Sequence, residues 1–214
     1  MEASIYLAVI GDVIRSRDVK DRESLQQNLR LEIERINNTY GETIAAGFVL
    51  TIGDEFQGLL KQVVGVEALL AEIRAAVHPV ELRFGLGMGG LDTPLEIVAL
   101  GMDGSCFHRA RSAIERAARR STEIEVETGT ADTSFHIYAL LYSGMRRRWT
   151  ARQRQVMDLS MSGESGKAIA KRLGITASAV SQHLRAAEAE NIVEATKHWI
   201  EAAERAFRKA GEDG

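Results

Sequence analysis

The sequence lacks the features of a secreted or membrane-bound protein. Its start, MEASIYLAVIGD, has no basic leader, and its apolar run stops at Gly11 and Asp12. We therefore expect neither a signal peptide nor a membrane span. The single cysteine, Cys106, excludes an internal disulfide and suits a reducing compartment, and we interpret it as a small buried apolar residue. A cytoplasmic protein is the expectation.

An excess of basic charge is absent from the chain as a whole but present in one segment. The formal net charge is −3, and 45% of the residues are apolar, which is ordinary for a globular protein. Residues 1–143 carry 14 basic and 21 acidic side chains, residues 144–188 carry 9 and 3, and residues 189–214 carry 4 and 6. Because nucleic-acid phosphates attract only the basic segment 144–188, this segregation of charge indicates that the chain has two different functions. The alternative is a solvated charged helix surface.

The basic segment contains the spacing of a helix-turn-helix unit. Ala170, Gly174 and Val180 stand at relative positions 0, 4 and 10, and Leu184 follows. The small Ala170 lets two helices cross closely, Gly174 permits the turn between them, and Val180 with Leu184 buries the inner face of the second helix. We expect helices near 150–160, 165–173 and 177–189.

The outer face of the third of these helices predicts contacts with double-stranded DNA. Four side chains of the types that bind base edges point away from the buried face: Ser178, Ser181, Gln182 and Arg185. Basic residues are expected to contact phosphates and to set affinity and register: Arg146, Arg147, Arg148, Arg152, Lys167, Lys171 and Arg172. Three-helix units of this shape also serve as protein docking modules, so a protein partner stays an alternative.

Residues 191–214 predict an amphipathic helix. An apolar stripe recurs at three- and four-residue spacing through Ile192, Thr196, Trp199, Ala203 and Phe207. The stripe packs either on the rest of the chain or against the same helix of a second subunit. A homodimer would match a two-fold symmetric operator.

The first 143 residues have the pattern of an α+β domain. A buried strand ends at Asp12, residues 22–39 have helical spacing, and a hairpin turns at Gly53 and Asp54. A helix near 64–77, a strand after Pro79 and a helix from about 105 to 120 complete the order βαββαβ with additions. This order is typical of a ferredoxin-like fold, an antiparallel sheet with helices on one face.

In that order Asp12 and Asp54 meet at one edge of the sheet, because the first strand and the hairpin lie side by side. Two close carboxylates repel each other and favour a cation between them. Mg²⁺ bound by this pair could hold the oxygens of a nucleoside triphosphate. The alternative is that Asp54 only shapes the turn.

The first 120 residues or so resemble the catalytic domain of class III nucleotidyl cyclases and their GGDEF relatives. GDVIRSRD is similar to the first metal-aspartate segment, TIGDEF to the second and RFGLGMGGL to the strand that follows, although Ile52 replaces the first glycine of the GGDEF pattern. The resemblance implies Asp12 and Asp54 as metal ligands. It also implies that GMDGSCFHRARSAIERA is the region for base and triphosphate.

The resemblance fails at four positions that select the purine or stabilise the transition state in cyclases: Leu50, Gly101, His108 and Ser112. Arg109 or Arg111 could bind phosphate instead if the register shifts by a turn or less. Loss of the cation that meets developing phosphate charge costs on the order of a hundredfold to a thousandfold in rate. The resemblance therefore implies a degenerate site.

A cyclase-like domain followed by a C-terminal helix-turn-helix is similar to the SatD family of bacterial proteins, which implies a presumed regulator. We expect a cyclase-like sensory or assembly domain over 1–143, an all-α helix-turn-helix domain that binds DNA over 144–190 and an amphipathic helix over 191–214. Two alternatives stay open. One is a metal-dependent nucleotidyl cyclase or transferase that uses Asp12 and Asp54, and the other is a structural dimeriser without a ligand.

Overall fold

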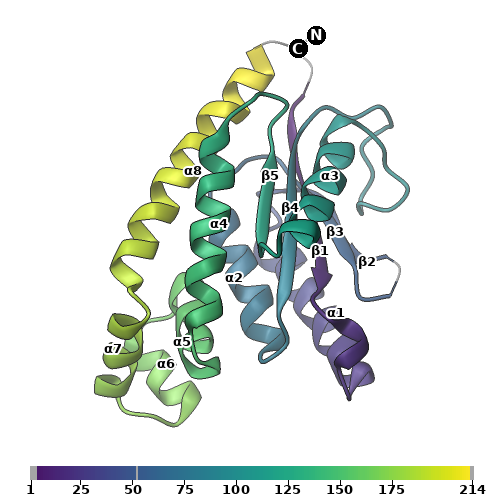
Figure 1. The fold of residues 1–214 in the computed structure, drawn as a ribbon. Coiled ribbons are helices and arrows are strands. Elements are labelled where there is room, and N and C mark those ends of the chain that lie inside the picture. Colours follow the sequence, from purple (N-terminus) through teal and green to yellow (C-terminus); the bar gives the residue numbers. More distant parts are fainter. Residues whose placement is uncertain (1–3, 52, 213–214) are drawn as a thin grey trace.

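Five strands form a single sheet in the order β2-β3-β1-β4-β5 (Figure 1). The structure, a computed structural model, describes residues 4–51 and 53–212. The strands are β1 (Tyr6–Val13), β2 (Ile44–Leu50), β3 (Phe56–Leu60), β4 (Leu82–Gly89) and β5 (Ile124–Glu127). β1 is central and antiparallel to both β3 and β4, whereas β5 is parallel to β4.

Helices cover both faces of this sheet. A short 3-10 helix (Ser16–Asp18) precedes eight α-helices in the described residues: α1 (Arg22–Thr39), α2 (Val66–Val77), α3 (Ser105–Arg120), α4 (Thr133–Arg148), α5 (Ala151–Met161), α6 (Gly166–Leu173), α7 (Ala177–Ala186) and α8 (Ala189–Glu212). Within the part of the chain that the structure describes, no helix has the length and apolar character needed to span a membrane.

The predicted βαββαβ order is confirmed, and α1 and α2 lie on one face of the sheet as expected. α1 buries Leu25, Leu29, Ile33 and Ile36, the residues whose spacing predicted it. The expectation that all helices of this domain lie on one face of the sheet is wrong for α3. This helix packs on the opposite face, against Ala8 and other β1 residues. The parallel strand β5 makes the sheet mixed, and neither β5 nor α4 was predicted.

A row of glycines in β4 brings α3 against the sheet. Phe84, Leu86 and Met88 point into the core beneath α1 and α2. The alternating Gly85 and Gly87 face α3 so closely that a Cβ atom on either would collide with its backbone, at the carbonyl oxygens of Ala110 and Cys106.

Cys106 lies in this close contact between α3 and β4. It is fully buried, and burial raises the pKa of its thiol to about 11. Its interpretation as a small buried apolar residue is confirmed.

Helices α5, α6 and α7 form a helical unit at one end of the molecule (Figure 1). The three helices stand where the sequence predicted them, except that α7 ends at Ala186 instead of near 189. Their small core of Val156, Leu159, Ile169 and Val180 also packs against Ala75 of α2. The unit is therefore docked on the sheet domain. The preceding helix α4 runs without a break across the expected boundary between 143 and 144.

The apolar stripe of α8 is used within the chain. Trp199 stacks on Tyr138 of α4 with ring centroids 5.3 Å apart and meets Phe135 edge-on at 6.3 Å. Ile192 and Ala203 are buried on either side of it. Of the two alternatives for this stripe, the structure shows packing on the same chain, so α8 does not offer its apolar face to a second subunit.

Candidate functional site

The outer face of α7 is exposed. Gly174 has φ 64°, a left-handed conformation that glycine adopts without strain, and it turns the chain between α6 and α7. The Thr176 side chain caps α7 by accepting a hydrogen bond from the Ala179 amide at 3.1 Å. Val180 faces inward and is buried, while the four predicted base-reading side chains all lie exposed: Ser178, Ser181, Gln182 and Arg185.

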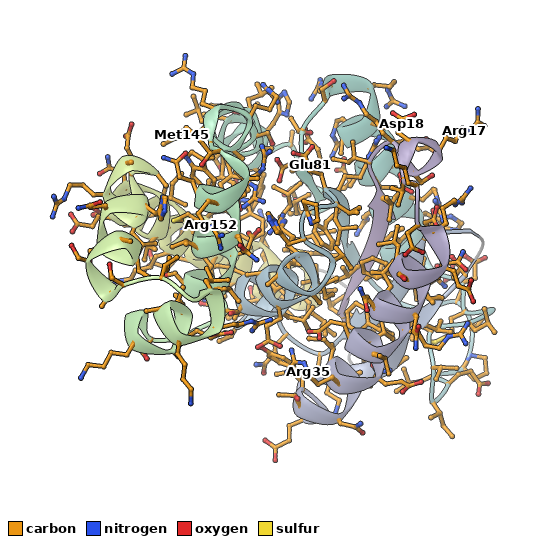
Figure 2. All side chains as sticks on the ribbon, turned by 90° about the horizontal axis from the view of Figure 1, so that it is seen from below. Arg17, Asp18, Arg35, Glu81, Met145 and Arg152 are labelled. Atoms are coloured by element: carbon orange, nitrogen blue, oxygen red, sulfur yellow. The ribbon has the colours of Figure 1, made fainter. Side chains whose placement is uncertain are left out.

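The predicted phosphate-contacting residues have different surroundings. Lys167, Lys171 and Arg148 are exposed. Arg172 forms an ion pair with Glu164, and Arg147 donates to the Ser121 carbonyl oxygen at 2.8 Å. Arg152 lies on α5 at the helical end of the molecule, far from Arg17 and Asp18 at the other side (Figure 2), and donates to Gln155 at 3.0 Å.

The expectation that Arg146 contacts phosphate is wrong, because this side chain is buried. Its residue is only 3% exposed. Arg146 Nε donates to Glu123 at 2.6 Å, and its two Nη atoms donate to the Asp158 carboxylate at 2.7 and 3.2 Å. Glu123 precedes β5 and Asp158 lies on α5, so one guanidinium joins the sheet to the helical unit.

Other charges limit the positive field around α7. Arg154 of α5 pairs at 3.2 Å with Glu81, which precedes β4. A surface groove of about 590 Å³ beside Arg185 is also lined by Glu188 and Glu190. Phosphate would thus be attracted to the Lys167 and Lys171 side of the unit more than to the end of α7.

At the acidic edge of the sheet, the carboxylates of Asp12 and Asp54 are directed towards opposite faces of the sheet. Ala8 and Ile10 of β1 pack towards α3, so the alternation of a strand puts Asp12 on that face as well. Asp54 is only 5% exposed, and its carboxylate accepts hydrogen bonds from Arg22 at 2.9 Å and Gln26 at 3.4 Å, both on α1. The predicted pair is thus drawn towards different helices.

Glu55, which the sequence did not single out, is the closer electrostatic neighbour of Asp12. Partial burial raises the pKa of Asp12 above its usual range; Arg83 lowers it, and Glu55 raises it more than Asp54 does. Hydrogen bonds from Arg111 at 2.5 and 2.7 Å lower the pKa of Glu55. The register pairs Gly11 with Phe56, which puts Asp12 and Glu55 next to each other on adjacent strands.

These residues fit a resident Mg²⁺ ion poorly. Each carboxylate already has a guanidinium partner: Arg22 for Asp54, Arg83 for Asp12 at 3.6 Å and Arg111 for Glu55. A cation would have to displace these arginines. Across residues 4–51 and 53–212, no group of three or more His, Cys, Asp or Glu side chains is arranged to hold a metal ion.

The two arginines predicted to bind phosphate point to different places. Arg111 is held by Glu55, whereas Arg109 donates to the Met88 carbonyl oxygen at 2.5 Å on β4. His108, at one of the positions where cyclases differ, lies 3.1 Å from Asp103, and Ser112 is exposed. Ile52 lies outside the described residues. The structure thus does not bring Arg109 and Arg111 together around one anion.

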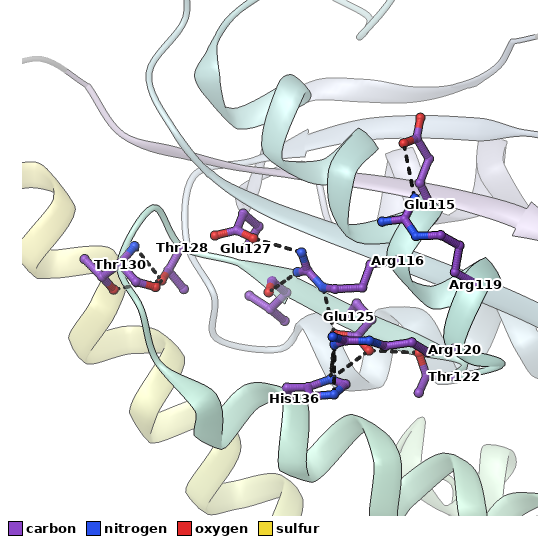
Figure 3. A network of polar contacts seen from close by, with 11 residues as sticks. Glu115, Arg116, Arg119, Arg120, Thr122, Glu125, Glu127, Thr128, Thr130 and His136 are labelled. Atoms are coloured by element: carbon purple, nitrogen blue, oxygen red, sulfur yellow. Dashed lines mark hydrogen bonds and ion pairs between the residues drawn. The ribbon is translucent and has the colours of Figure 1, made fainter.

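A polar network at β5 was missed by sequence reasoning (Figure 3). The buried carboxylate of Glu125 accepts hydrogen bonds from Arg116 at 3.2 Å and Thr122 at 3.0 Å and lies 3.1 Å from His136. Arg116 also pairs with Glu127 at 3.0 Å. The charged side chains of this network, which come from α3, β5 and α4, are paired with one another, and this indicates a structural role.

Comparison with known proteins places the chain in a family. A model of the SatD family matches residues 6–198. The chain belongs to the SatD family. The fold of this SatD-family chain is similar to a dimeric guanylyl cyclase domain of the RhoGC fusion protein from the aquatic fungus Blastocladiella emersonii. That pair is 16% identical with a TM-score of 0.41, over 54% of this chain and 75% of the other.

A bacterial light-regulated adenylyl cyclase is also similar in fold, at 14% identity and a TM-score of 0.44, over 70% of this chain and 83% of the other. A comparison with curated protein sequences gave no significant match.

Replacing Arg146 should destabilise the protein far more than replacing its exposed neighbour. Arg146→Ala leaves Glu123 and Asp158 buried without a cation, which costs about 3–5 kcal/mol of unfolding free energy. Arg148→Ala should change it by no more than about 0.5 kcal/mol. Urea unfolding followed by circular dichroism measures both. Equal small losses in the two variants would show that the Arg146 ion pairs do not hold the helical unit.

Asp12→Asn should stabilise the protein at neutral pH. Because the folded state raises the pKa of Asp12, ionised Asp12 costs stability above that pKa, and the cost disappears as the pH falls below its unfolded value of about 3.9. The advantage of Asp12→Asn in thermal unfolding should therefore shrink from pH 7 to pH 3. Asp21→Asn is the matched control of opposite sign, since hydrogen bonds from Ser24 lower the pKa of Asp21. A pH-independent effect of Asp12→Asn contradicts the prediction.

Proposed function

We propose that this SatD-family protein is a DNA-binding transcription regulator whose α7 enters the major groove. The observation that carries the proposal is the exposed face of α7, where Ser178, Gln182 and Arg185 project from a helix whose inner side is fixed by Val180. Side chains of these types bond to base edges when a helix lies in the groove. The turn at Gly174 sets α7 at an angle to α6, as such docking requires.

Phosphate contacts are assigned to exposed cations on the neighbouring helices. Lys167 and Lys171 are one turn apart on α6, and Arg148 closes α4. Such contacts fix register and give most of the salt dependence of binding. Arg147 and Arg172 would have to leave Ser121 and Glu164 to join them. In this proposal the sheet domain senses a ligand or mediates assembly.

We also propose a homodimer that pairs through α4. Ile137, Leu140 and Leu141 form an exposed apolar stripe on this helix, and Leu141 is 66% exposed. Two antiparallel copies crossing at this stripe would bury these three side chains against one another. Such pairing is isologous, and it would present two α7 helices with two-fold symmetry.

Base-reading and phosphate-binding residues should respond differently to substitution. Gln182→Ala should weaken binding to the promoter of the protein's own locus by roughly 1–3 kcal/mol, with a smaller effect on unrelated sequence. Lys171→Ala should weaken binding to all sequences alike and reduce the salt slope by about one. Fluorescence anisotropy over a salt series measures both effects. Glu194→Ala, at an exposed position of α8, is the control.

Absence of salt-dependent binding to every fragment of that locus would overturn the DNA proposal. Two further results would favour the alternatives. Cyclic or dinucleotide product formed from ATP or GTP, and lost in Asp12→Ala, would indicate a nucleotidyl cyclase or transferase. A stable dimer that binds neither DNA nor nucleotide would indicate a structural dimeriser.

Leu141→Glu should convert the dimer to a monomer, because it puts a charge on the most exposed residue of the apolar stripe. Leu31→Glu is the matched control, since Leu31 is similarly exposed but lies on α1. Sedimentation velocity of the full chain gives the result. A dimer that survives Leu141→Glu, or that Leu31→Glu disrupts equally, would remove α4 as the interface.

A further inference from the structure

One arginine in the core has no acidic partner. Arg74 of α2 is 5% exposed, and its guanidinium lies over the Phe84 ring at 4.7 Å and near the Tyr142 ring at 5.9 Å. Its Nε and one Nη atom make no hydrogen bond with any described residue. A buried donor without an acceptor costs free energy, more so when it is charged. These N–H groups therefore call for an acceptor that the chain itself does not provide.

The guanidinium faces a small cavity with aromatic walls. The cavity has a volume of about 20 Å³ and is lined by residues of α2, β5, α4, α5 and α8, which include Glu67, Tyr138, Tyr142 and Trp199. One oxygen of Glu67, Oε2, is also buried without a hydrogen-bond partner. A donor-rich and an acceptor-rich group therefore border one cavity, and neither is satisfied.

An open groove of about 370 Å³ adjoins this cavity. Cavity and groove share Glu67, Met161 and Thr196 as lining residues. The other groove residues come from α8 and the end of α5 and are apolar (Val193 and Ile200), acidic (Glu201 and Glu204), basic (Lys197) or neutral polar (Ser160). Burial raises the pKa of Glu67, and the nearby Glu204 raises it further, so a cation bound here would relieve repulsion between carboxylates.

Met161 lines both spaces. Its side chain is half-buried, and methionine is unbranched with three rotatable bonds, so it adapts to a change in what it packs against. Rotation of this side chain would join the cavity to the groove. The combined space would offer Arg74 for an anion, Glu67 for a cation and an apolar wall at Ile200.

We propose that groove and cavity together bind a small zwitterion with an apolar body, of the class of apolar α-amino acids. Its carboxylate would accept hydrogen bonds from Arg74, and its ammonium group would donate to Glu67. Its side chain would lie along Met161 and Ile200 in the groove.

Such a ligand would contact both the sheet domain and the helical unit. Arg74 and Glu67 lie on α2, whereas Met161 lies in the last turn of α5. Binding would therefore favour one position of α5 relative to α2. An effect on DNA affinity follows only if the proposed DNA-binding function holds; binding at the site does not depend on it.

Isothermal titration calorimetry and thermal unfolding of the full chain test the site. L-leucine, L-methionine and L-phenylalanine are the probes, and each is paired with the carboxylic acid that lacks its ammonium group and the amine that lacks its carboxylate; for L-phenylalanine these are 3-phenylpropionate and phenethylamine. At least one amino acid should raise the melting temperature, and its analogues should bind about tenfold more weakly or worse, because each leaves one buried charge unpaired.

Variants separate this site from adventitious binding. Glu67→Gln and Arg74→Met should each weaken binding about tenfold or more. Ile200→Trp should narrow the groove without removing either charged group, so it tests the site independently of the Arg74 variant, which could misfold. Glu194→Gln, at an exposed position of α8, should bind as the parent does.

The proposal is overturned if no probe binds the folded protein, which would leave water as the partner of Arg74. It is equally overturned if binding persists unchanged in Glu67→Gln and Ile200→Trp. DNA affinity measured without any amino acid tests the regulator function separately.

Discussion

The buried guanidinium of Arg146 determines how the two halves of the molecule are held together. It bonds at once to Glu123 before β5 and to Asp158 on α5, and its ring neighbours Tyr142 and Trp149 shield it from water. Charges this deep are costly to desolvate, and the pairing is favourable only while all three groups stay in place. The orientation of α5, and with it of α7, therefore depends on a contact made to the sheet.

Much of the architecture could be predicted because local residue patterns reported it directly. The spacing of Leu25, Leu29 and Ile33 matches α1 residue for residue, and Gly174 occupies the left-handed turn that its place in the motif required. β5 was missed because it has only four residues. The apolar side chains of α4 surround the helix, with Ile137 and Leu141 exposed and Phe135 buried, so no single amphipathic period marks it.

The candidate sites were predicted less well than the fold, since side-chain partners depend on contacts between distant segments. In the run Arg146, Arg147, Arg148, nothing local distinguishes the buried arginine from the exposed ones. The feature that distinguishes Arg146 is its ion pair with Asp158, which lies 12 residues further along the chain. Asp54 likewise finds Arg22 across 32 positions in the sequence. Strand order correctly brought Asp12 near the hairpin, but the partners that neutralise each carboxylate could not be read from spacing.

The glycine row of β4 also limits how the molecule can move. Between most helices and sheets a layer of side chains can repack when one element slides over the other. Gly85 and Gly87 remove that layer, so α3 rests on the backbone of β4 itself. A shift of α3 would have to carry the central strands with it, and through the Arg111–Glu55 pair it would pull on the hairpin as well. Motions that change the relation of the two halves are therefore left to the other face, where α2, α4 and α5 meet through deformable side chains such as Met161.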